Sequence, residues 1–193
     1  MSQEEVLVIK HGALGDIILA TGAFAAIRAH HPQARITVLT KHAYAALLAR
    51  SPYFDEIWVD RKPRWYEREA IGRLRAMLNS RSFVCVYDLQ TSLRTTLYQW
   101  LFTRPWPRIS NVSRFSSHGY TDPARHQLHA LAHDAAQLAR VGIVPQKPDV
   151  SWLDEAPPVA LAPGSYVLLV PGGAPHRPEK RWPAEQYASL AAE

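Results

Sequence analysis

Short apolar runs that alternate with helix-like segments are the strongest constraint on how this chain can fold. Val6–Lys10 is a continuous apolar run, the pattern of a strand buried on both faces. Further strands are predicted at Arg35–Thr40, Glu56–Asp60 and Phe83–Leu89, and helices at Ile17–His30, His42–Arg50, Trp65–Ser80 and Ser92–Phe102. Regular alternation of strand and helix predicts a parallel sheet covered by helices on both faces, the doubly wound, Rossmann-like α/β architecture.

The second half of the chain changes character after one more helix. That helix is predicted over Arg125–Val141 and is closed by Gly142. Five of the fifteen prolines then fall between Pro145 and Pro163, which disfavours both helix and central strand. We therefore expect a domain at residues 1–144, a proline-rich linker at 145–165, and the incomplete beginning of a second Rossmann-like domain at 166–193. In that last part a strand and glycines at Tyr166–Gly173 repeat the opening pattern, and a helix follows over Trp182–Glu193.

Composition restricts the compartment and the class of partner. The single cysteine, Cys85, allows no disulfide within the chain, and no run approaches the roughly 20 apolar residues of a membrane span, so a cytoplasmic protein is expected. The net charge of +5 is concentrated in residues 61–114, which hold 11 Lys and Arg against 3 Asp and Glu. Arginine suits phosphate and carboxylate partners, although such a block can also be a solvated surface. The block contains no nucleic-acid-binding motif, so no nucleic-acid partner is predicted.

The turn after the first strand is the candidate site. Gly12 and Gly15 allow the chain to turn tightly and a ligand to approach at the carboxyl end of a strand. The spacing of these glycines fits neither the G-x-G-x-x-G dinucleotide fingerprint nor the phosphate-binding P-loop. Asp16 follows the turn directly, and two roles are open for it: a helix N-cap, or a general base at the cleft.

Histidine spacing raises the alternative of a metal site. His126, His129 and His133 would share one face of the Arg125–Val141 helix, with Leu128, Leu131 and Leu138 on the opposite, buried face. Ala130 stands where the H-E-x-x-H zinc motif requires glutamate, so no metal is predicted.

Three motifs in order resemble the ADP-heptose:lipopolysaccharide heptosyltransferases, glycosyltransferase family 9. The stretch VLVIKHGALGDIILATGAFAAIRAHHPQARITVLT holds a strand, the Leu14-Gly15-Asp16 turn, a helix and a Pro-x-Ala-x-Ile strand. The stretch YDLQTSLRTTL resembles the family's Asp-x-Gln segment, and VPGGAPHRPEKRWPAEQYASLA resembles the opening of its donor domain. The resemblance implies the GT-B arrangement of two Rossmann-like domains, the start of the second being present here. It also implies inverting transfer of heptose from ADP-heptose to a sugar hydroxyl of the lipopolysaccharide core.

The same resemblance assigns roles to residues. Asp16 becomes the general base that activates the acceptor hydroxyl. The acceptor carries carboxylates and phosphates, and its expected contacts are Gly12, Gly15, Arg61, Lys62, Arg64, Gln90 and Arg94. The donor diphosphate is expected at Gly172, Gly173 and Lys180. No metal or cofactor is implied, because the nucleotide sugar is a substrate, and the enzyme would contact the inner face of the cytoplasmic membrane peripherally.

Two other function classes stay open at this stage. A non-catalytic module that binds anionic glycolipid would use the same basic residues. A nicotinamide-dependent oxidoreductase is less favoured, because Thr40-Lys41 stands where an acidic residue should end the second strand. If the transferase assignment holds, the 193 residues alone should be inactive, because most of the donor domain is absent.

Overall fold

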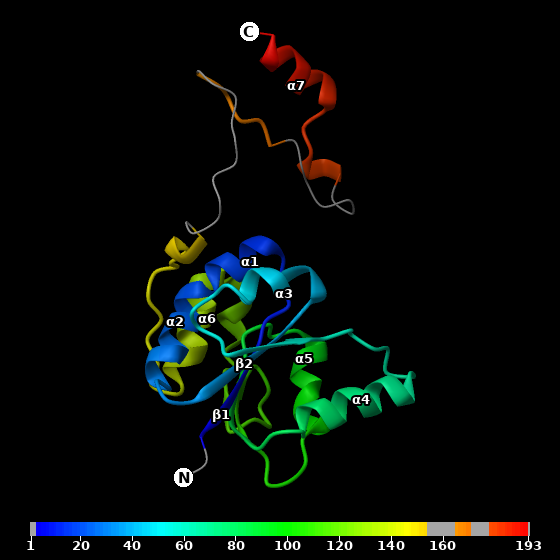
Figure 1. Ribbon diagram of the computed structural model, residues 1–193, viewed down its shortest axis with the longest axis vertical. Helices are drawn as coiled ribbons and strands as arrows, with labels where there is room; N and C mark the ends of the chain where they lie inside the picture. The colour runs from blue at the N-terminus through cyan, green and yellow to red at the C-terminus, as the bar shows by residue number, and fades with distance from the viewer. Residues whose placement is uncertain (1–2, 154–164, 171–177, 193) are drawn as a thin grey trace. The chain divides into compact units, whose positions relative to one another are not determined.

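The computed structural model describes residues 3–153, 165–170 and 178–192 (Figure 1). The chain divides into two compact units, Met1–Glu155 and Ala156–Glu193, and each is described by itself.

A six-stranded parallel sheet forms the centre of the first unit. Its strands are β1 (Glu5–Ile9), β2 (Arg35–Thr40), β3 (Glu56–Val59), β4 (Phe83–Asp88), β5 (Arg108–Asn111) and β6 (His118–Gly119). They lie in the order β3-β2-β1-β4-β5-β6, and every neighbouring pair is parallel. The predicted α/β class and its first four strands are confirmed, whereas β5 and β6 were not predicted. Because all the strands run the same way, their carboxyl ends share one edge of the sheet.

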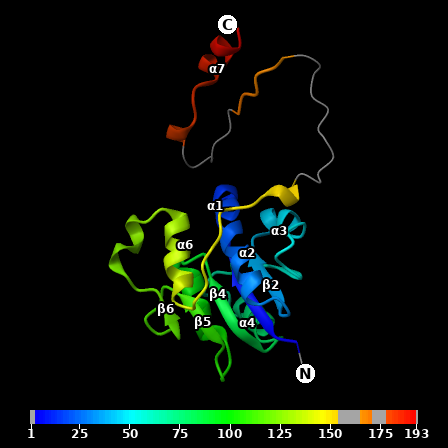
Figure 2. The same ribbon diagram turned by 90° about the vertical axis from the view of Figure 1, so that its left-hand side faces the viewer.

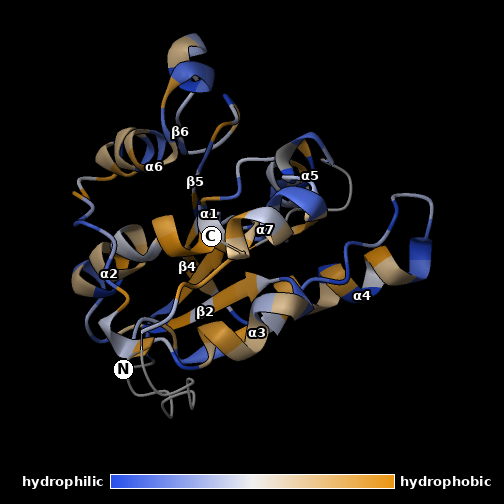
Figure 3. Ribbon diagram, turned by 90° about the horizontal axis from the view of Figure 1, so that it is seen from above, coloured by the Kyte–Doolittle hydropathy of each residue, from blue (hydrophilic) through white to orange (hydrophobic). Residues whose placement is uncertain are grey.

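Helices cover both faces of the sheet, and the strand side chains alternate between two cores (Figures 1 and 2). One face packs on α1 (Leu14–Leu19), α2 (Thr21–His30), α3 (His42–Leu48) and α6 (Ala130–Ala139). The other packs on α4 (Arg68–Leu78) and on the 3-10 helix Tyr98–Leu101, which continues α5 (Leu93–Leu97). In β1, Val8 faces the first core and Leu7 the second, so the strand is buried on both sides, as its apolar run predicted. Figure 3 shows β2 and β4 as hydrophobic ribbons between the helices.

Several predicted helix bounds are wrong. The helix expected over Ile17–His30 begins at Leu14 and is divided at Ala20 into α1 and α2. The helix expected over Ser92–Phe102 is α-helical only from Leu93 to Leu97 before it tightens to 3-10 geometry. Other predicted elements are shorter than expected by a few residues at their ends: α3, α4, β3 and β4.

The helix expected over Arg125–Val141 is also wrong, because the chain breaks it in two. A 3-10 helix, Pro123–Gln127, is followed by two extended residues, and α6 begins only at Ala130. His129 is the N-cap of α6, and its ring nitrogen accepts the N–H of Leu131 at 3.4 Å. Leu128 and Leu131 are exposed and Leu138 alone of the three leucines is buried, so the predicted buried leucine face does not form.

Part of the proline-rich segment packs against the first unit. We call residues 145–153 the strap. Gln146 donates its backbone N–H to Gly22 of α2 at 3.4 Å, and the N–H of Asp149 bonds Thr21 Oγ1 at 3.1 Å. Trp152, in the 3-10 helix Ser151–Leu153, packs on the first core. The division of the chain into domains stays a prediction, but this half of the expected linker has contacts of its own.

The described parts of the second unit are short. Residues 165–170 form no strand, so the strand predicted to start at Tyr166 is wrong over this stretch. A 3-10 helix, Pro178–Lys180, precedes α7 (Ala184–Ala191), which lies within the predicted terminal helix. Pro183 is the N-cap residue of α7, and Trp182 stacks edge-on against Tyr187 at 4.9 Å.

Candidate functional site

A tight turn joins β1 to α1 at the carboxyl edge of the sheet. A Cβ on Gly12 would lie 2.5 Å from the Cβ of Asp16, so only glycine fits this turn as it stands. A Cβ on Gly15 would meet nothing within 4 Å, which means that Gly15 leaves open space beside the turn. The two glycines therefore contribute differently: Gly12 makes the turn, and Gly15 leaves its approach uncovered.

Asp16 is the third residue of α1, and its carboxylate is exposed. Its Oδ2 accepts the backbone N–H of Ala13, the N-cap residue, at 2.9 Å. The aspartate thus stabilises the helix start from the third helical position rather than as the N-cap itself. It also lines a pocket of about 270 Å³ with Lys10, Gln90 and Asp134. The carboxylate is therefore fixed at one oxygen and accessible from a pocket.

Side chains from the neighbouring strand ends hold this turn in place. Gln90, after β4, accepts the backbone N–H of His11 through Oε1 at 2.8 Å. Lys41, after β2, donates from Nζ to the carbonyl of Gly12 at 3.1 Å. Lys10, at the end of β1, donates to the carbonyl of Leu89 at 2.9 Å. Bonds between three adjacent strand ends fix the turn, and with it the start of α1, relative to the sheet.

Lys10 is a buried ammonium group that faces the same pocket as Asp16. Its Nζ lies 3.8 Å from Asp134 Oδ2 on α6, and both side chains are less than a tenth exposed. A buried charge needs a partner of opposite sign, and Asp134 supplies it from α6. The pocket thus contains both a cation and carboxylates.

Beneath the turn, His11 and Asp60 form a buried pair. His11 is 1% exposed and Asp60 4%, and His11 Nε2 lies 3.2 Å from Asp60 Oδ2 without the angles of a hydrogen bond. Asp60 Oδ2 accepts the hydroxyl of Tyr98 at 2.6 Å. Burial lowers the pKa of His11 to about 4, against the opposing effect of Asp60 and with a further lowering from nearby lysine and arginine side chains. His11 is therefore neutral at pH 7.

Two of the predicted basic residues lie next to this pair. Lys62 has a positive φ of 52°, and its N–H bonds Asp60 Oδ1 at 2.7 Å, which closes a tight turn after β3. Arg94 donates to the carbonyl of Pro63 at 2.7 Å and lies over the ring of Trp65. Burial lowers the pKa of Lys62, and the positive charges of Lys41 and Arg94 lower it further. These cations are thus close enough to repel one another, an arrangement that an anion would stabilise.

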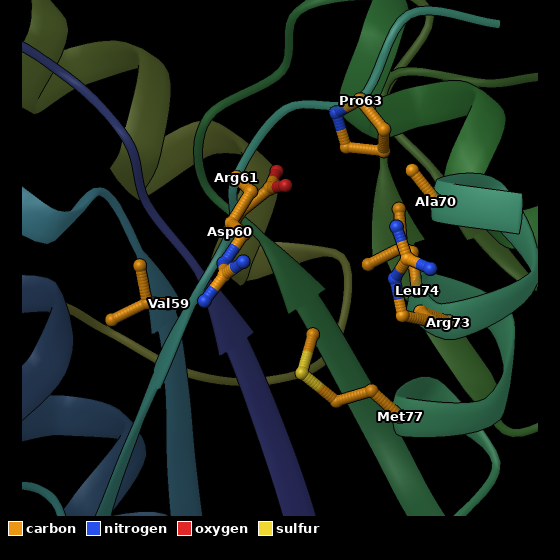
Figure 4. A pocket seen from close by; sticks show the side chains of 8 residues that line it. All are labelled: Val59, Asp60, Arg61, Pro63, Ala70, Arg73, Leu74 and Met77. Atoms are coloured by element: carbon orange, nitrogen blue, oxygen red, sulfur yellow. The ribbon is translucent and has the colours of Figure 1, made fainter. Parts of the chain in front are cut away.

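The other predicted basic residues lie elsewhere. Arg61 lines a separate pocket between the end of β3 and α4 (Figure 4). Arg64 is exposed, and its guanidinium bonds the hydroxyl of Tyr66. The structure therefore places Asp16 and Gln90 on one pocket, and Lys62 and Arg94 in the cluster around His11. Arg61 and Arg64 belong to the loop between β3 and α4.

Asp88 supports the loop that carries Gln90. It is 1% exposed, and Oδ1 accepts the N–H groups of Gln90 and Thr91, both at 3.1 Å. Burial raises the pKa of Asp88 to about 7, although these hydrogen bonds and the nearby Lys10 act in the opposite direction.

Sequence reasoning missed several members of this site. They are Lys10, His11, Lys41, Asp60 and Asp134. The first four lie within two residues of the end of a predicted strand, so their positions at the carboxyl edge were the available signal. Asp134 had no such signal, because α6 reaches the pocket only through the tertiary fold.

The predicted donor residues have little structural description. Gly172 and Gly173 lie outside the described residues, and Lys180 is described only by its backbone at the end of a 3-10 helix. Within the described ranges, no group of three or more His, Cys, Asp or Glu side chains could hold a metal ion. His129 and His133 do not form a helical pair, because His129 precedes α6. None of the helices in the described part is both long and apolar enough to cross a membrane.

Comparison with known proteins shows the fold. A crystal structure of a family 9 glycosyl transferase from Veillonella parvula has a TM-score of 0.67 and 22% identity, over 99% of this chain and 60% of that one. E. coli heptosyltransferase WaaC, with ADP-2-deoxy-2-fluoro heptose, gives 0.70 and 16% over 97% and 64% of the two chains. E. coli ADP-heptose lps heptosyltransferase II gives 0.57 and 20% over 97% and 60%. The chain thus shares the fold of these proteins and spans less than two thirds of their length.

Sequence comparison adds one short match. A Haemophilus influenzae protein that is provisionally named a glycosyltransferase is 36% identical over 59 residues, which are 31% of this chain and 17% of that protein. No family model matches the chain.

Proposed function

We propose that the chain is part of an inverting glycosyltransferase that transfers heptose from ADP-heptose to the inner core of lipopolysaccharide. The observation that carries the proposal is the Asp16 carboxylate, which is exposed on a glycine turn and lines a pocket at the carboxyl edge of the sheet. Similar structures support the choice of donor, because one was solved with an ADP-heptose analogue and another is named for ADP-heptose.

In this proposal Asp16 is the general base. One carboxylate oxygen is held by the N–H of Ala13, and Oδ1, which has no hydrogen bond from the part of the chain that the structure describes, would accept the proton of an acceptor hydroxyl. The hydroxyl oxygen forms a bond to the anomeric carbon while the bond from that carbon to the diphosphate breaks. The electron pair leaves with the nucleoside diphosphate, and attack from the opposite face inverts the configuration.

The cations around the turn would bind the anionic acceptor. Lys62 and Arg94 repel each other in the free protein, so a phosphate or carboxylate near them relieves that repulsion. Gln90 uses Oε1 to hold the turn, so its amide N–H groups would contact the sugar. Arg61 and Arg64 would contact outer parts of the acceptor, and Gly12 and Gly15 would let it approach the turn.

The remaining assignments concern the donor and the location. Gly172, Gly173 and Lys180 would bind the donor diphosphate, without a metal or cofactor. The protein would act in the cytoplasm, with peripheral contact at the inner face of the cytoplasmic membrane. The 193 residues alone should not transfer sugar, since they span only 60–64% of the similar structures.

The test is Asp16→Asn in the chain joined to a complete donor-binding domain, with ADP release from ADP-heptose as the readout. Asparagine retains an oxygen for the N–H of Ala13, so the melting temperature should stay unchanged while kcat falls by about 10²–10⁴-fold. Asp122→Asn, at an exposed cap that does not line the pocket of Asp16, is the matched control and should keep full turnover. Retained turnover in Asp16→Asn would remove the base assignment. Transfer from other nucleotide sugars but not from ADP-heptose would overturn the donor assignment.

A non-catalytic module for anionic glycolipid is the second candidate. The cluster of Lys41, Lys62 and Arg94 favours it, because that cluster would bind an anion without any chemistry. Glycolipid binding with no ADP release from the completed protein would select this candidate over the transferase.

A further inference from the structure

A second pocket, of about 280 Å³, lies between the end of β3 and helix α4 (Figure 4). Its walls include the apolar side chains of Val59, Ala70, Leu74 and Met77. Figure 4 shows Arg61 on the strand side, and Arg73, Leu74 and Met77 on the helix side. The pocket thus combines an apolar interior with two guanidinium groups from different elements.

The turn after β3 explains why Arg61 belongs to this pocket and Lys62 does not. Asp60 Oδ1 accepts the N–H of Lys62, and the positive φ of Lys62 reverses the chain at that point. Consecutive basic side chains therefore separate: Lys62 joins the cluster around His11, and Arg61 lines the β3–α4 pocket. Asp60 also lines this pocket, but its carboxylate is engaged by Lys62 and Tyr98.

The charge of the pocket is positive. Arg73 pairs with Glu69 at 3.7 Å, but both side chains are largely exposed, so this pair is weak. None of the ion pairs among the described residues involves Arg61. The loop that leads from Arg61 into α4 also exposes the rings of Trp65 and Tyr66, which is an amphipathic surface rather than a purely polar one.

We propose that the β3–α4 pocket binds one anionic amphiphile, with an alkyl chain against Leu74 and Met77 and a phosphate head group between Arg61 and Arg73. Guanidinium groups suit phosphate, and the apolar walls gain stability when a chain removes them from water. The volume lies just below the roughly 300–1,000 Å³ of pockets for drug-sized ligands, so a single short chain fits and a whole diacyl lipid does not. This binding needs neither a nucleotide sugar nor Asp16, so it goes beyond the proposed transfer step, although it draws on Arg61, which the proposed function also gives to the outer parts of the acceptor.

The test uses n-octyl phosphate below its micelle-forming concentration, with calorimetry on the 193-residue chain. Octyl phosphate should bind in one-to-one ratio, and both n-octanol and inorganic phosphate should bind at least tenfold more weakly, since each supplies half of the interaction. Equal binding of octanol would show that the arginines take no part. Binding to anionic vesicles without binding of monomeric octyl phosphate would show surface adsorption instead of a pocket. Either result overturns the proposal.

Matched variants separate the pocket from the rest of the basic surface. Ala70→Phe fills the pocket from a half-buried helix position and should weaken binding by about tenfold or more. Arg73→Gln should weaken it by about threefold to fivefold, the scale of an exposed ion pair. Arg75→Gln removes the same charge from an exposed position of α4 outside the pocket and should change nothing. Circular dichroism confirms that each variant is folded, and equal affinities across the three variants would contradict the proposal.

Asp16→Asn distinguishes this inference from the proposed function. Octyl phosphate should bind this variant with unchanged affinity, because Asp16 lies on a different pocket. A variant without transfer activity that still binds octyl phosphate supports the pocket whatever the outcome for the transferase. Loss of octyl phosphate binding in Asp16→Asn would contradict the separate site.

Discussion

At the scale of single residues, the carboxyl edge of the sheet contains buried polar side chains that need hydrogen bonds or must stay uncharged. His11 occupies the position where the first strand turns toward α1, and its ring is enclosed although neither ring nitrogen has a hydrogen-bond partner among the described residues. Such a ring is stable only when it is uncharged. The neutral imidazole thus fills the space under the turn without requiring a counter-ion of its own.

The burial of His11 leads to a prediction about pH. Its pKa in the folded chain is about 4 and below the ordinary value of 6.5, so the unfolded chain binds more protons between these values. The deprotonation of His11 therefore increases the free energy of unfolding as the pH rises from about 4 to about 6.5, by up to about 3 kcal/mol. In His11→Gln this contribution is absent. The free energy of unfolding of the wild type minus that of the variant should therefore increase from pH 4.5 to pH 7. Urea unfolding at both pH values measures it.

Comparison within a pair of variants isolates the effect of His11 from other titrating groups. Asp88 has a pKa raised to about 7, so its contribution to the free energy of unfolding falls as the pH rises, which opposes the contribution of His11. Asp88 is present in both proteins and cancels in the difference. His126→Gln, which removes an exposed imidazole, is the matched control. A constant difference between wild type and His11→Gln would contradict the prediction.

At the scale of elements, the contact between α2 and the strap depends on a missing side chain. A Cβ on Gly22 would lie 2.1 Å from the carbonyl oxygen of Gln146, so the helix and the strap approach each other as closely as glycine allows. Gly22→Ala should therefore destabilise the chain by about 1–3 kcal/mol, despite the better helix propensity of alanine. Chemical denaturation measures the change.

Gly72 of α4 offers the matched control. A Cβ there meets nothing within 4 Å, so Gly72→Ala should stabilise the chain by about 0.5–1 kcal/mol through helix propensity alone. Opposite signs for the same substitution in two helices would assign the difference to the strap. Stabilisation by both changes would show that the strap does not pack on α2 in solution.

The sequence predicts those helices and strands that have a clear local pattern of apolar residues, and it misses those that depend on tertiary contacts. The first four strands carry continuous apolar runs, whereas β5 (RISN) has a single buried aliphatic residue and β6 is two residues long, so only pairing in the sheet defines them. The break before α6 is set by the ring of His129 as a cap, against a helical pattern that continues through it. Capping by a histidine is not a signal that periodicity can detect.

The site divides in the same way. The positions of Gly12 and Asp16 at the carboxyl edge could be predicted, because a strand, a turn and a helix start specify that edge locally. Their functional roles stay predictions. The roles of Gln90 and Lys41 were not, since each depends on a hydrogen bond between strands that are separated in the sequence. Nor could the sequence separate Arg61 from Lys62, which depends on the positive φ at Lys62.

At the scale of the whole molecule, both hydrophobic cores are built within the first unit. One core lies under α1, α2, α3 and α6, and the other lies under α4. All members of both cores lie between Val6 and Trp152 in the sequence. The two cores share the strands between them, so the layers of the first unit depend on one another. Folding of this unit should therefore need none of residues 156–193, and the strap should be part of what it needs.

Two truncations test this expectation and with it the position of the domain boundary. A chain that ends at Glu155 keeps both cores and the strap, so it should unfold cooperatively with the urea midpoint of the full chain. A chain that ends at Val144, the boundary expected from the prolines, loses the bonds from Gln146 and Asp149 and the packing of Trp152. It should be less stable by about 1–3 kcal/mol, on the scale of two hydrogen bonds and one partly buried ring. Equal stability of the two chains would show that the strap is a linker after all, as the proline content predicted.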